Sequence, residues 1–178
     1  MDDARQIQNL ALIGFMGTGK SSSGQIVAGH LNFRFLDTDA LMEERAGKPI
    51  AEIFADDGEA VFREWESRVV AELALVSETV ISTGGGLAAN DEHLGSLKTH
   101  SLVVCLWAGP DAIWQRVRHQ AHRPLLNGAN PKEDIAKLLK EREPYYRKAD
   151  VLINTEMRSL KDVAQQLTYH FEQARGGE

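Results

Sequence analysis

The residues in this sequence that are most able to do chemistry stand in one short run, residues 14–21. The run begins with Gly14 and ends in Gly19-Lys20-Ser21, which fits the G-x-x-x-x-G-K-[ST] pattern of a phosphate-binding loop. Glycine lets the backbone turn so that its N–H groups surround phosphate oxygens, and a following helix adds positive partial charge. We expect Lys20 to reach the outer phosphates and Ser21 to offer a hydroxyl to Mg²⁺. The run predicts binding of a nucleoside triphosphate, but not what receives the phosphate.

The elements that must position this loop are short apolar runs that alternate with helical patterns. Five runs predict strands, at residues 7–13, 33–37, 79–82, 102–107 and 151–154. Such alternation predicts an α/β fold, with a parallel sheet and helices on both of its faces. Ligands of these sheets bind beyond the carboxyl ends of the strands. The residues that follow each strand are therefore the candidates for chemistry.

Two carboxylates, Asp37 and Asp39, follow the second strand. If the chain is still extended there, both side chains point to the same side. One could hold Mg²⁺ through water, and the other could accept a hydrogen bond from an acceptor hydroxyl. Alternatively, Asp39 caps a helix over residues 40–46. The third strand is not followed by an aspartate, so either Asp37 takes the magnesium role or no residue does.

Arg63 and Glu66 are neighbours on the surface of a helix predicted over residues 59–75. Their spacing favours an exposed ion pair worth under about 1 kcal/mol over a guanidinium that Glu66 aims at an anionic substrate. Three glycines, residues 84–86, follow the third strand. They indicate either a close approach of the backbone to a ligand or a flexible turn, and the residues alone leave both open.

The last third of the chain offers a turn-rich segment and further arginines. Residues 119–131 are mostly polar, with a short apolar run at residues 124–126. This composition is typical of a lid that folds over a nucleotide or of a plain surface loop. A helix is predicted over residues 132–143, and Pro144 disfavours its continuation. Arg142 at its end is explained by the helix dipole unless a ligand lies nearby.

Composition bounds the class of protein. A chain of 178 residues suits one domain, over residues 1–178. A net charge of −6 without a basic run opposes nucleic acid as a partner. No apolar segment is long enough for a membrane span, and the N-terminus does not resemble a signal peptide, so we expect a cytoplasmic protein. We also expect a monomer, and a buried thiol at Cys105.

Taken together and in this order, the motifs resemble those of the shikimate kinases. The matching motifs are residues 14–21, 37–39, Phe62-Arg63 with Glu66, 84–86, 123–126, and Arg142 with Pro144 and Tyr146. The resemblance covers roughly residues 10–150. It implies a single-domain P-loop kinase whose five parallel strands have the order 2-3-1-4-5. It further implies a substrate-binding region near residues 38–65 and a mobile lid near residues 119–131.

The resemblance also implies an activity and a set of roles. The reaction is phosphorylation of the 3-hydroxyl of shikimate by ATP with Mg²⁺, which gives shikimate 3-phosphate and ADP on the route to chorismate and the aromatic amino acids. The implied catalytic residues are Lys20, Asp39 and Arg123, and the implied magnesium ligands are Ser21 and Asp37. The implied ATP contacts are Gly17, Thr18, Gly19, Lys20, Ser21, Ser22, Arg116, Arg123 and Arg158. The implied shikimate contacts are Asp39, Arg63, Gly84, Gly85, Gly86 and Arg142, with Phe54 and Phe62 as walls for the ring.

Two other functions fit parts of the pattern. A different small-molecule kinase, similar to the gluconate kinases, would share the phosphate-binding loop and the sheet, but not the set of Arg63, the triple glycine and Arg142. A nucleotide-binding regulator without turnover would lack a catalytic part, and each expected part is present in the sequence. Whether Asp39 removes the proton of the hydroxyl or only orients the hydroxyl stays open.

Overall fold

The computed structural model describes residues 5–120 and 129–176 of the chain. Within these residues, five parallel strands form one sheet in the order β2-β3-β1-β4-β5. The strands are β1 (Asn9–Ile13), β2 (Arg34–Asp37), β3 (Thr79–Ser82), β4 (Ser101–Trp107) and β5 (Val151–Asn154). The expected fold class and strand order are confirmed, and each strand ends at the residue that the sequence predicted.

The central strands are apolar because they are buried on both faces. Every residue of β1 and β3 is buried, and β4 is buried up to Trp107. The outer strands β2 and β5 are partly exposed. Parallel sheets covered on both faces have this pattern. As a result, the loop after β1 lies at the centre of the carboxyl edge of the sheet, between the loops after β3 and β4.

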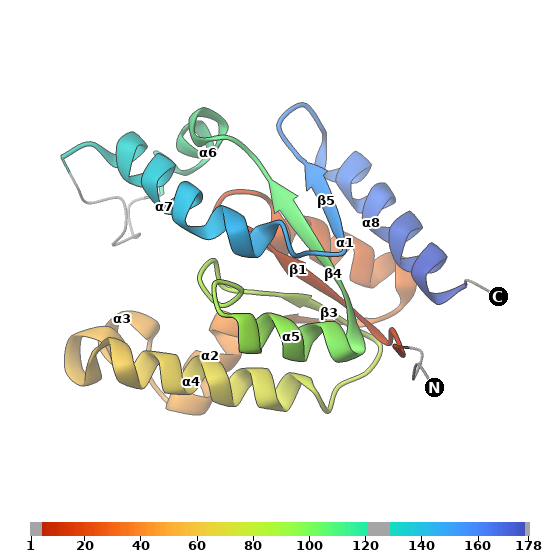
Figure 1. Ribbon diagram of the computed structural model, residues 1–178, viewed down its shortest axis with the longest axis horizontal. Coiled ribbons are helices and arrows are strands. Elements are labelled where there is room, and N and C mark those ends of the chain that lie inside the picture. The colour runs from red at the N-terminus through yellow and green to blue at the C-terminus, as the bar shows by residue number, and fades with distance from the viewer. Residues whose placement is uncertain (1–4, 121–128, 177–178) are drawn as a thin grey trace.

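Helices cover both faces of the sheet (Figure 1). Alternate residues of β1 serve the two faces: Leu10 and Leu12 pack in a core with α1 and α8, and Ala11 and Ile13 pack in a core with α4, α5, α6 and α7. The helical elements are α1 (Lys20–Leu31), α2 (Thr38–Ala46), α3 (Ile50–Glu52), η1 (Ile53–Asp57), α4 (Gly58–Leu73), α5 (Asp91–His100), α6 (Pro110–Val117), α7 (Pro131–Tyr146) and α8 (Leu160–Arg175).

The start of α2 differs from the expectation. The helix begins at Thr38, so the chain is not extended from Asp37 to Asp39. The Asp37 side chain is the cap, because its Oδ1 accepts hydrogen bonds from the backbone N–H of Asp39 at 3.0 Å and of Ala40 at 3.3 Å. The expectation that Asp39 caps this helix is therefore wrong, and its carboxylate is left for other partners.

One π-helical turn, η1, joins α3 to α4 through Gly58 at φ 83°. The predicted end of the helix over residues 132–143 is wrong. Pro144 does not end α7, because the helix continues to Tyr146. Arg142 and Tyr146 are consequently four residues apart on one helix, so their side chains lie on the same face.

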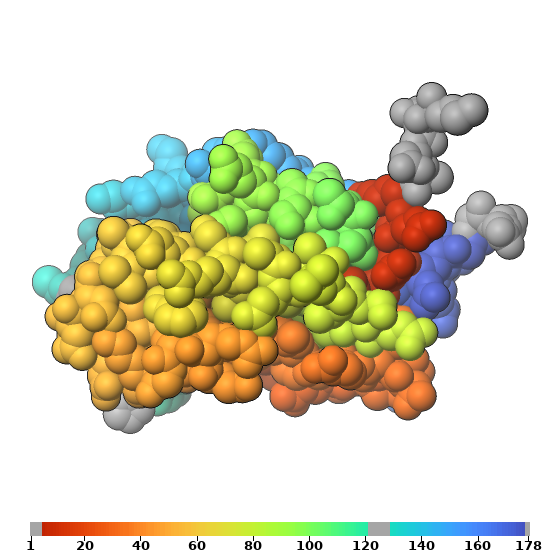
Figure 2. Space-filling model, turned by 90° about the horizontal axis from the view of Figure 1, so that it is seen from below, coloured from red at the N-terminus to blue at the C-terminus, as the bar shows by residue number. Residues whose placement is uncertain are grey.

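The segment expected to bind substrate, residues 38–65, forms α2, α3, η1 and the start of α4. It lies at one end of the molecule, where Figure 2 shows its gold and yellow surface. Of the lid expected at residues 119–131, residues 121–128 lie outside the described part of the chain. Among the described residues, no helix is long and apolar enough to cross a membrane.

Candidate active site

The phosphate-binding loop joins β1 to α1 as a closely packed turn. Gly14 has a φ of 137°, and a Cβ atom there would collide with the carbonyl oxygen of Leu106 on the neighbouring strand. Lys20 curls back over the loop, where its Nζ donates hydrogen bonds to the carbonyl oxygens of Gly14 at 2.9 Å and Phe15 at 2.8 Å. The loop and the ammonium group thus form the compact, positively charged turn that binds phosphates.

Three oxygen-bearing side chains meet beside this loop. The Ser21 hydroxyl donates to Asp37 Oδ2 at 3.0 Å, and Ser21 Oγ also lies 3.0 Å from Ser82 Oγ. Each residue comes from a different element: Ser21 from the start of α1, Asp37 from the end of β2 and Ser82 from the end of β3. A carboxylate with hydroxyl groups is an oxygen donor set of the kind that Mg²⁺ prefers.

Asp39 lies on the first turn of α2, against the triple-glycine loop. A Cβ atom on Gly84 would collide with Asp39 Oδ1, so glycine is required there by lack of room. Thr38 holds the same loop, because its Oγ1 accepts a hydrogen bond from the Gly84 N–H at 2.9 Å. Burial raises the pKa of Asp39 to about 6, and the charge of Asp37 adds to the rise while Lys20 opposes it. One side of the residue stays open to solvent, so an incoming hydroxyl can reach it.

Arg63 is held by two carboxylates of its own helix. Its Nη1 donates to Glu66 Oε2 at 2.6 Å, and its Nη2 donates to Glu59 Oε1 at 3.2 Å. Glu66 is only 3% exposed, so the pair is not the exposed ion pair that spacing favoured. A buried carboxylate fixes the direction of the guanidinium more firmly than an exposed partner does, because it has few other positions to adopt.

Arg142 is held against the triple-glycine loop from the other side. The Gly85 carbonyl oxygen accepts hydrogen bonds from Arg142 Nη1 at 3.0 Å and from the Tyr146 hydroxyl at 2.9 Å. Burial raises the pKa of Tyr146 to about 12, so this hydroxyl keeps its proton. Nη1 of Arg63 and Nη2 of Arg142 lie 3.5 and 3.7 Å from where a Cβ atom on Gly86 would be. Two guanidinium groups, one from α4 and one from α7, therefore meet over one glycine.

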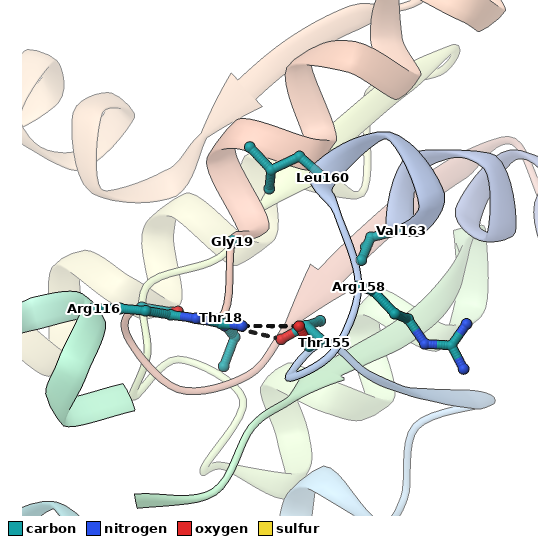
Figure 3. A pocket seen from close by; sticks show the side chains of 8 residues that line it. Thr18, Gly19, Arg116, Thr155, Arg158, Leu160 and Val163 are labelled. Carbon is teal, nitrogen blue, oxygen red and sulfur yellow. Dashed lines mark hydrogen bonds between the residues drawn. The ribbon is translucent and has the colours of Figure 1, made fainter. Parts of the chain in front are cut away.

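A hollow of about 210 Å³ lies beside the phosphate-binding loop. Arg116 crosses it, because its Nη1 donates to Gly17 O at 3.1 Å and to Thr155 Oγ1 at 3.0 Å, while its Nη2 donates to Thr155 O at 2.8 Å. Figure 3 shows Arg116 directed at Thr155, whereas the Arg158 guanidinium points away from it. The hollow is lined by Gly17, Thr18, Gly19, Arg116, Thr155, Arg158, Leu160 and Val163.

Comparison with known proteins decides among the candidate kinases. A family model described as shikimate kinase matches residues 16–172. The chain belongs to the shikimate kinase family. A shikimate kinase of Thermodesulfovibrio yellowstonii is 40% identical over 96% of this chain and 99% of its own length. The structure of a shikimate kinase from Acinetobacter baumannii in complex with shikimate, 35% identical, has a TM-score of 0.85 over 92% of both chains.

The comparison also settles the alternatives. A gluconokinase from Sinorhizobium meliloti has a TM-score of 0.65 but is 18% identical, a likeness that shows the fold alone. Membership of the shikimate kinase family confirms the activity expected from the motifs, ATP-dependent phosphorylation of shikimate. It supports this activity over a gluconate kinase-like activity and over a regulator without turnover.

The site of this shikimate kinase contains residues that sequence reasoning did not single out. Thr38, Ser82 and Thr155 each lie at or directly after the end of a strand, where the rule for parallel sheets directs attention, so their position was a usable signal. Tyr146 stood in a matching motif without an assigned role, because its contact with Gly85 depends on α7 continuing past Pro144. Arg123 lies outside the described residues.

Proposed function

We propose that the chain holds the carboxylate of shikimate between Arg63 and Arg142 and transfers the γ-phosphoryl group of ATP to the 3-hydroxyl. The observation that carries this proposal is the meeting of the two guanidinium groups within 4 Å of one point above Gly86. A carboxylate there would accept paired N–H···O bonds from planar donors, which fix its orientation as well as its position. The point lies beside the phosphate-binding loop, because Gly85 is close to the Met16 backbone.

The walls for the ring come from the same region. Phe54 and Phe62 lie with ring centroids 4.4 Å apart, and the Arg63 guanidinium lies 5.3 Å from the Phe62 centroid. Phe54 is 42% exposed, which is unusual for a large apolar side chain and is explained if a ring packs on it. In the proposal, the backbone of Gly84, Gly85 and Gly86 contacts the substituents on the opposite side of the ring.

Asp39 is proposed to receive the reacting hydroxyl. With a pKa of about 6 it is mostly ionised at neutral pH, so it can accept a hydrogen bond from the 3-hydroxyl. A carboxylate whose pKa is raised is also a better proton acceptor than an ordinary one. We therefore propose that Asp39 orients the hydroxyl and takes its proton as the oxygen attacks phosphorus.

Ser21 and Asp37 are proposed to hold Mg²⁺, and their oxygen donors fit that ion. When bound, Mg²⁺ neutralises charge that builds up between the outer phosphates during transfer. Ser82 keeps the Ser21 hydroxyl in place. Lys20 balances charge on the transferring group from the other side of the loop, in the way that lysines of phosphate-binding loops do.

The nucleotide is proposed to extend from the loop into the hollow of Arg116 and Thr155. Its contacts would come from Gly17, Thr18, Gly19, Lys20, Ser21, Ser22, Arg116, Arg123 and Arg158. Thr18 is rigid enough for this, because its hydroxyl donates to Phe15 O at 2.8 Å. A monomer in the cytoplasm, with residues 1–178 as one domain and no nucleic-acid or membrane partner, completes the proposal.

An acceptor panel tests the function directly. ADP release is followed with ATP, Mg²⁺ and either shikimate, gluconate or a deoxynucleoside as the only acceptor. We expect shikimate to give at least about a hundredfold higher kcat/KM than the others, because it combines a carboxylate for the two arginines with a ring that fits against Phe54 and Phe62. Gluconate has the carboxylate but no ring, and a deoxynucleoside has no carboxylate. Comparable rates with gluconate would contradict the proposal.

A further inference from the structure

The triple-glycine loop is held by side chains at three successive points. Gly84 N–H donates to Thr38 Oγ1, Gly85 O accepts from Arg142 and Tyr146, and Leu87 O lies 3.2 Å from His93 Nδ1. The first two contacts involve residues already placed around the proposed shikimate pocket. His93 has no role there so far, although it is only 5% exposed.

His93 stands in the first turn of α5, after the Asn90 cap. Because a carbonyl oxygen can only accept, the Nδ1 atom must carry the proton that is shared with Leu87 O. The other ring nitrogen, Nε2, lies 3.0 Å from the hydroxyl of Ser67 on α4. The imidazole therefore spans the gap between the end of the glycine loop and α4.

Ser67 connects this bridge to the substrate arginine. Its Oγ lies 3.1 Å from the carbonyl oxygen of Arg63, one turn earlier on the same helix. A neutral His93 accepts from Ser67 at Nε2, whereas an imidazolium donates to Ser67, which then donates to Arg63 O. The connection between His93 and Ser67 is kept in both protonation states, so it acts as a structural tie and not as a pH switch.

The tie lies in the middle of α4. Buried residues run along this helix from Phe62 and Glu66 to Leu73, whereas Arg63 and Ser67 are exposed. Figure 1 shows the earlier part of α4 extending towards α3, at the end of the molecule away from the termini. A polar bridge one turn from Arg63 limits how far this part of α4 can move from the glycine loop.

We propose that His93 is a positioning residue for shikimate. Through Leu87 O and Ser67 Oγ it sets the glycine loop against α4, so that the Arg63 guanidinium meets that of Arg142 above Gly86. This inference rests on the proposed function, because it assumes that the two arginines bind the shikimate carboxylate. His93 itself touches neither substrate nor the reacting atoms.

The test measures Kd for shikimate and for ATP by calorimetry in Ser67→Ala, His93→Ala and the double variant. Loss of one hydrogen bond predicts a shikimate Kd about fivefold weaker in Ser67→Ala, and loss of both ring contacts about tenfold weaker in His93→Ala. The double variant should match His93→Ala, because both changes remove one connection. Kd for ATP should stay within about twofold, since the changes lie away from the phosphate-binding loop. Ser67→Thr keeps the hydroxyl and should restore shikimate binding.

His100→Ala is the matched control, because His100 is a second buried histidine of α5, at its opposite end. It should lower the unfolding midpoint while leaving Kd for shikimate unchanged. If His93→Ala does not fold, Kd for shikimate in Ser67→Ala still tests the positioning role, because Ser67 is exposed and its replacement should not prevent folding. Native-like shikimate binding in folded Ser67→Ala would overturn the positioning role. If the unaltered protein binds no shikimate, the proposed function fails as well. If Arg142→Ala loses shikimate binding while Ser67→Ala and His93→Ala keep it, the proposed function stands and only this inference fails.

Discussion

The raised pKa of Asp39 makes a prediction that can be tested before any substrate is added. Burial is its main cause, the charge of Asp37 adds to the rise, and together they bring the pKa to about 6, above the ordinary value of 3.8. At pH 5 only about one-tenth of such a group is ionised, compared with about nine-tenths of an ordinary aspartate. The ionisation state of this carboxylate should therefore change through the range of pH 5 to 7.

Two measurements follow this titration. Carboxyl ¹³C NMR of the protein alone should show one aspartate titrating near pH 6, and Asp39→Asn should remove that resonance. If Asp39 acts as the proposed base, kcat/KM for shikimate should fall about tenfold from pH 7 to pH 5, because only the ionised form can accept the proton. A resonance titrating near pH 4, together with a flat kcat/KM over this range, would refute the reasoning.

The physical cause can be separated from the assignment with two further variants. Asp37→Asn should lower the pKa of Asp39, because it removes the largest charge effect that raises it. Glu44→Gln is the matched control on the same helix: Glu44 is exposed, pairs with Arg45 and is not among the groups that shift Asp39. Unchanged titration of Asp39 in Asp37→Asn would show that the repulsion between the two carboxylates is unimportant.

Three other predictions concern single residues. Arg142→Ala should weaken shikimate binding about a hundredfold, through loss of a charge-assisted pair, with Kd for ATP nearly unchanged; equal loss of both in a folded variant would contradict the division of labour. Arg123→Ala should cost about 3 kcal/mol of transition-state stabilisation, seen in kcat, and an unchanged kcat would remove Arg123 from the mechanism. Burial lowers the pKa of His100, and the charge of Arg5 adds to this. The unfolded chain therefore takes up a proton below pH 6.5 that the folded chain does not. Stability from this group is present above pH 6.5 and falls as the pH drops towards the folded-state pKa. Urea unfolding at pH 7.5 and 5.5 should show a smaller loss in His100→Asn than in the unaltered protein, and equal losses would count against the assignment.

The sequence predicted the sheet well because each strand is an apolar run that stops at a residue of a different kind. Gly14 follows β1 and Gly109 lies just after β4, while Asp37 and Ser82 close β2 and β3. Such changes of residue type mark where burial ends. They predicted the carboxyl edge of the sheet to the residue.

The helix ends were harder to predict because several residues could serve the same purpose. Asp37 and Asp39 are both able to cap α2, and only the geometry of the turn decides for Asp37. A proline usually ends a helix, but here Tyr146, two residues beyond Pro144, gains a partly buried hydrogen bond to Gly85 O. That bond depends on tertiary packing, which local sequence does not encode.

The convergence of the substrate residues could be predicted only in part. The spacing of Arg63 and Glu66 showed that they are neighbours, but not that Glu66 is buried. The triple glycine left a close approach to a ligand and a flexible turn open, and the structure shows that the Asp39 carboxylate and the two arginines lie against these glycines. No local pattern linked His93 to Ser67, because a single histidine in a helix carries no indication of its partner.

The central claim, that two arginines beside a phosphate-binding loop hold an organic acid for phosphorylation, is tested most directly by removing the acid. The measurement compares kcat/KM for shikimate with that for its methyl ester, in the same ADP-release assay. Loss of two charge-assisted contacts predicts a ratio of about a hundred or more for the unaltered protein. A ratio near one would show that the carboxylate is not recognised, and would contradict the account.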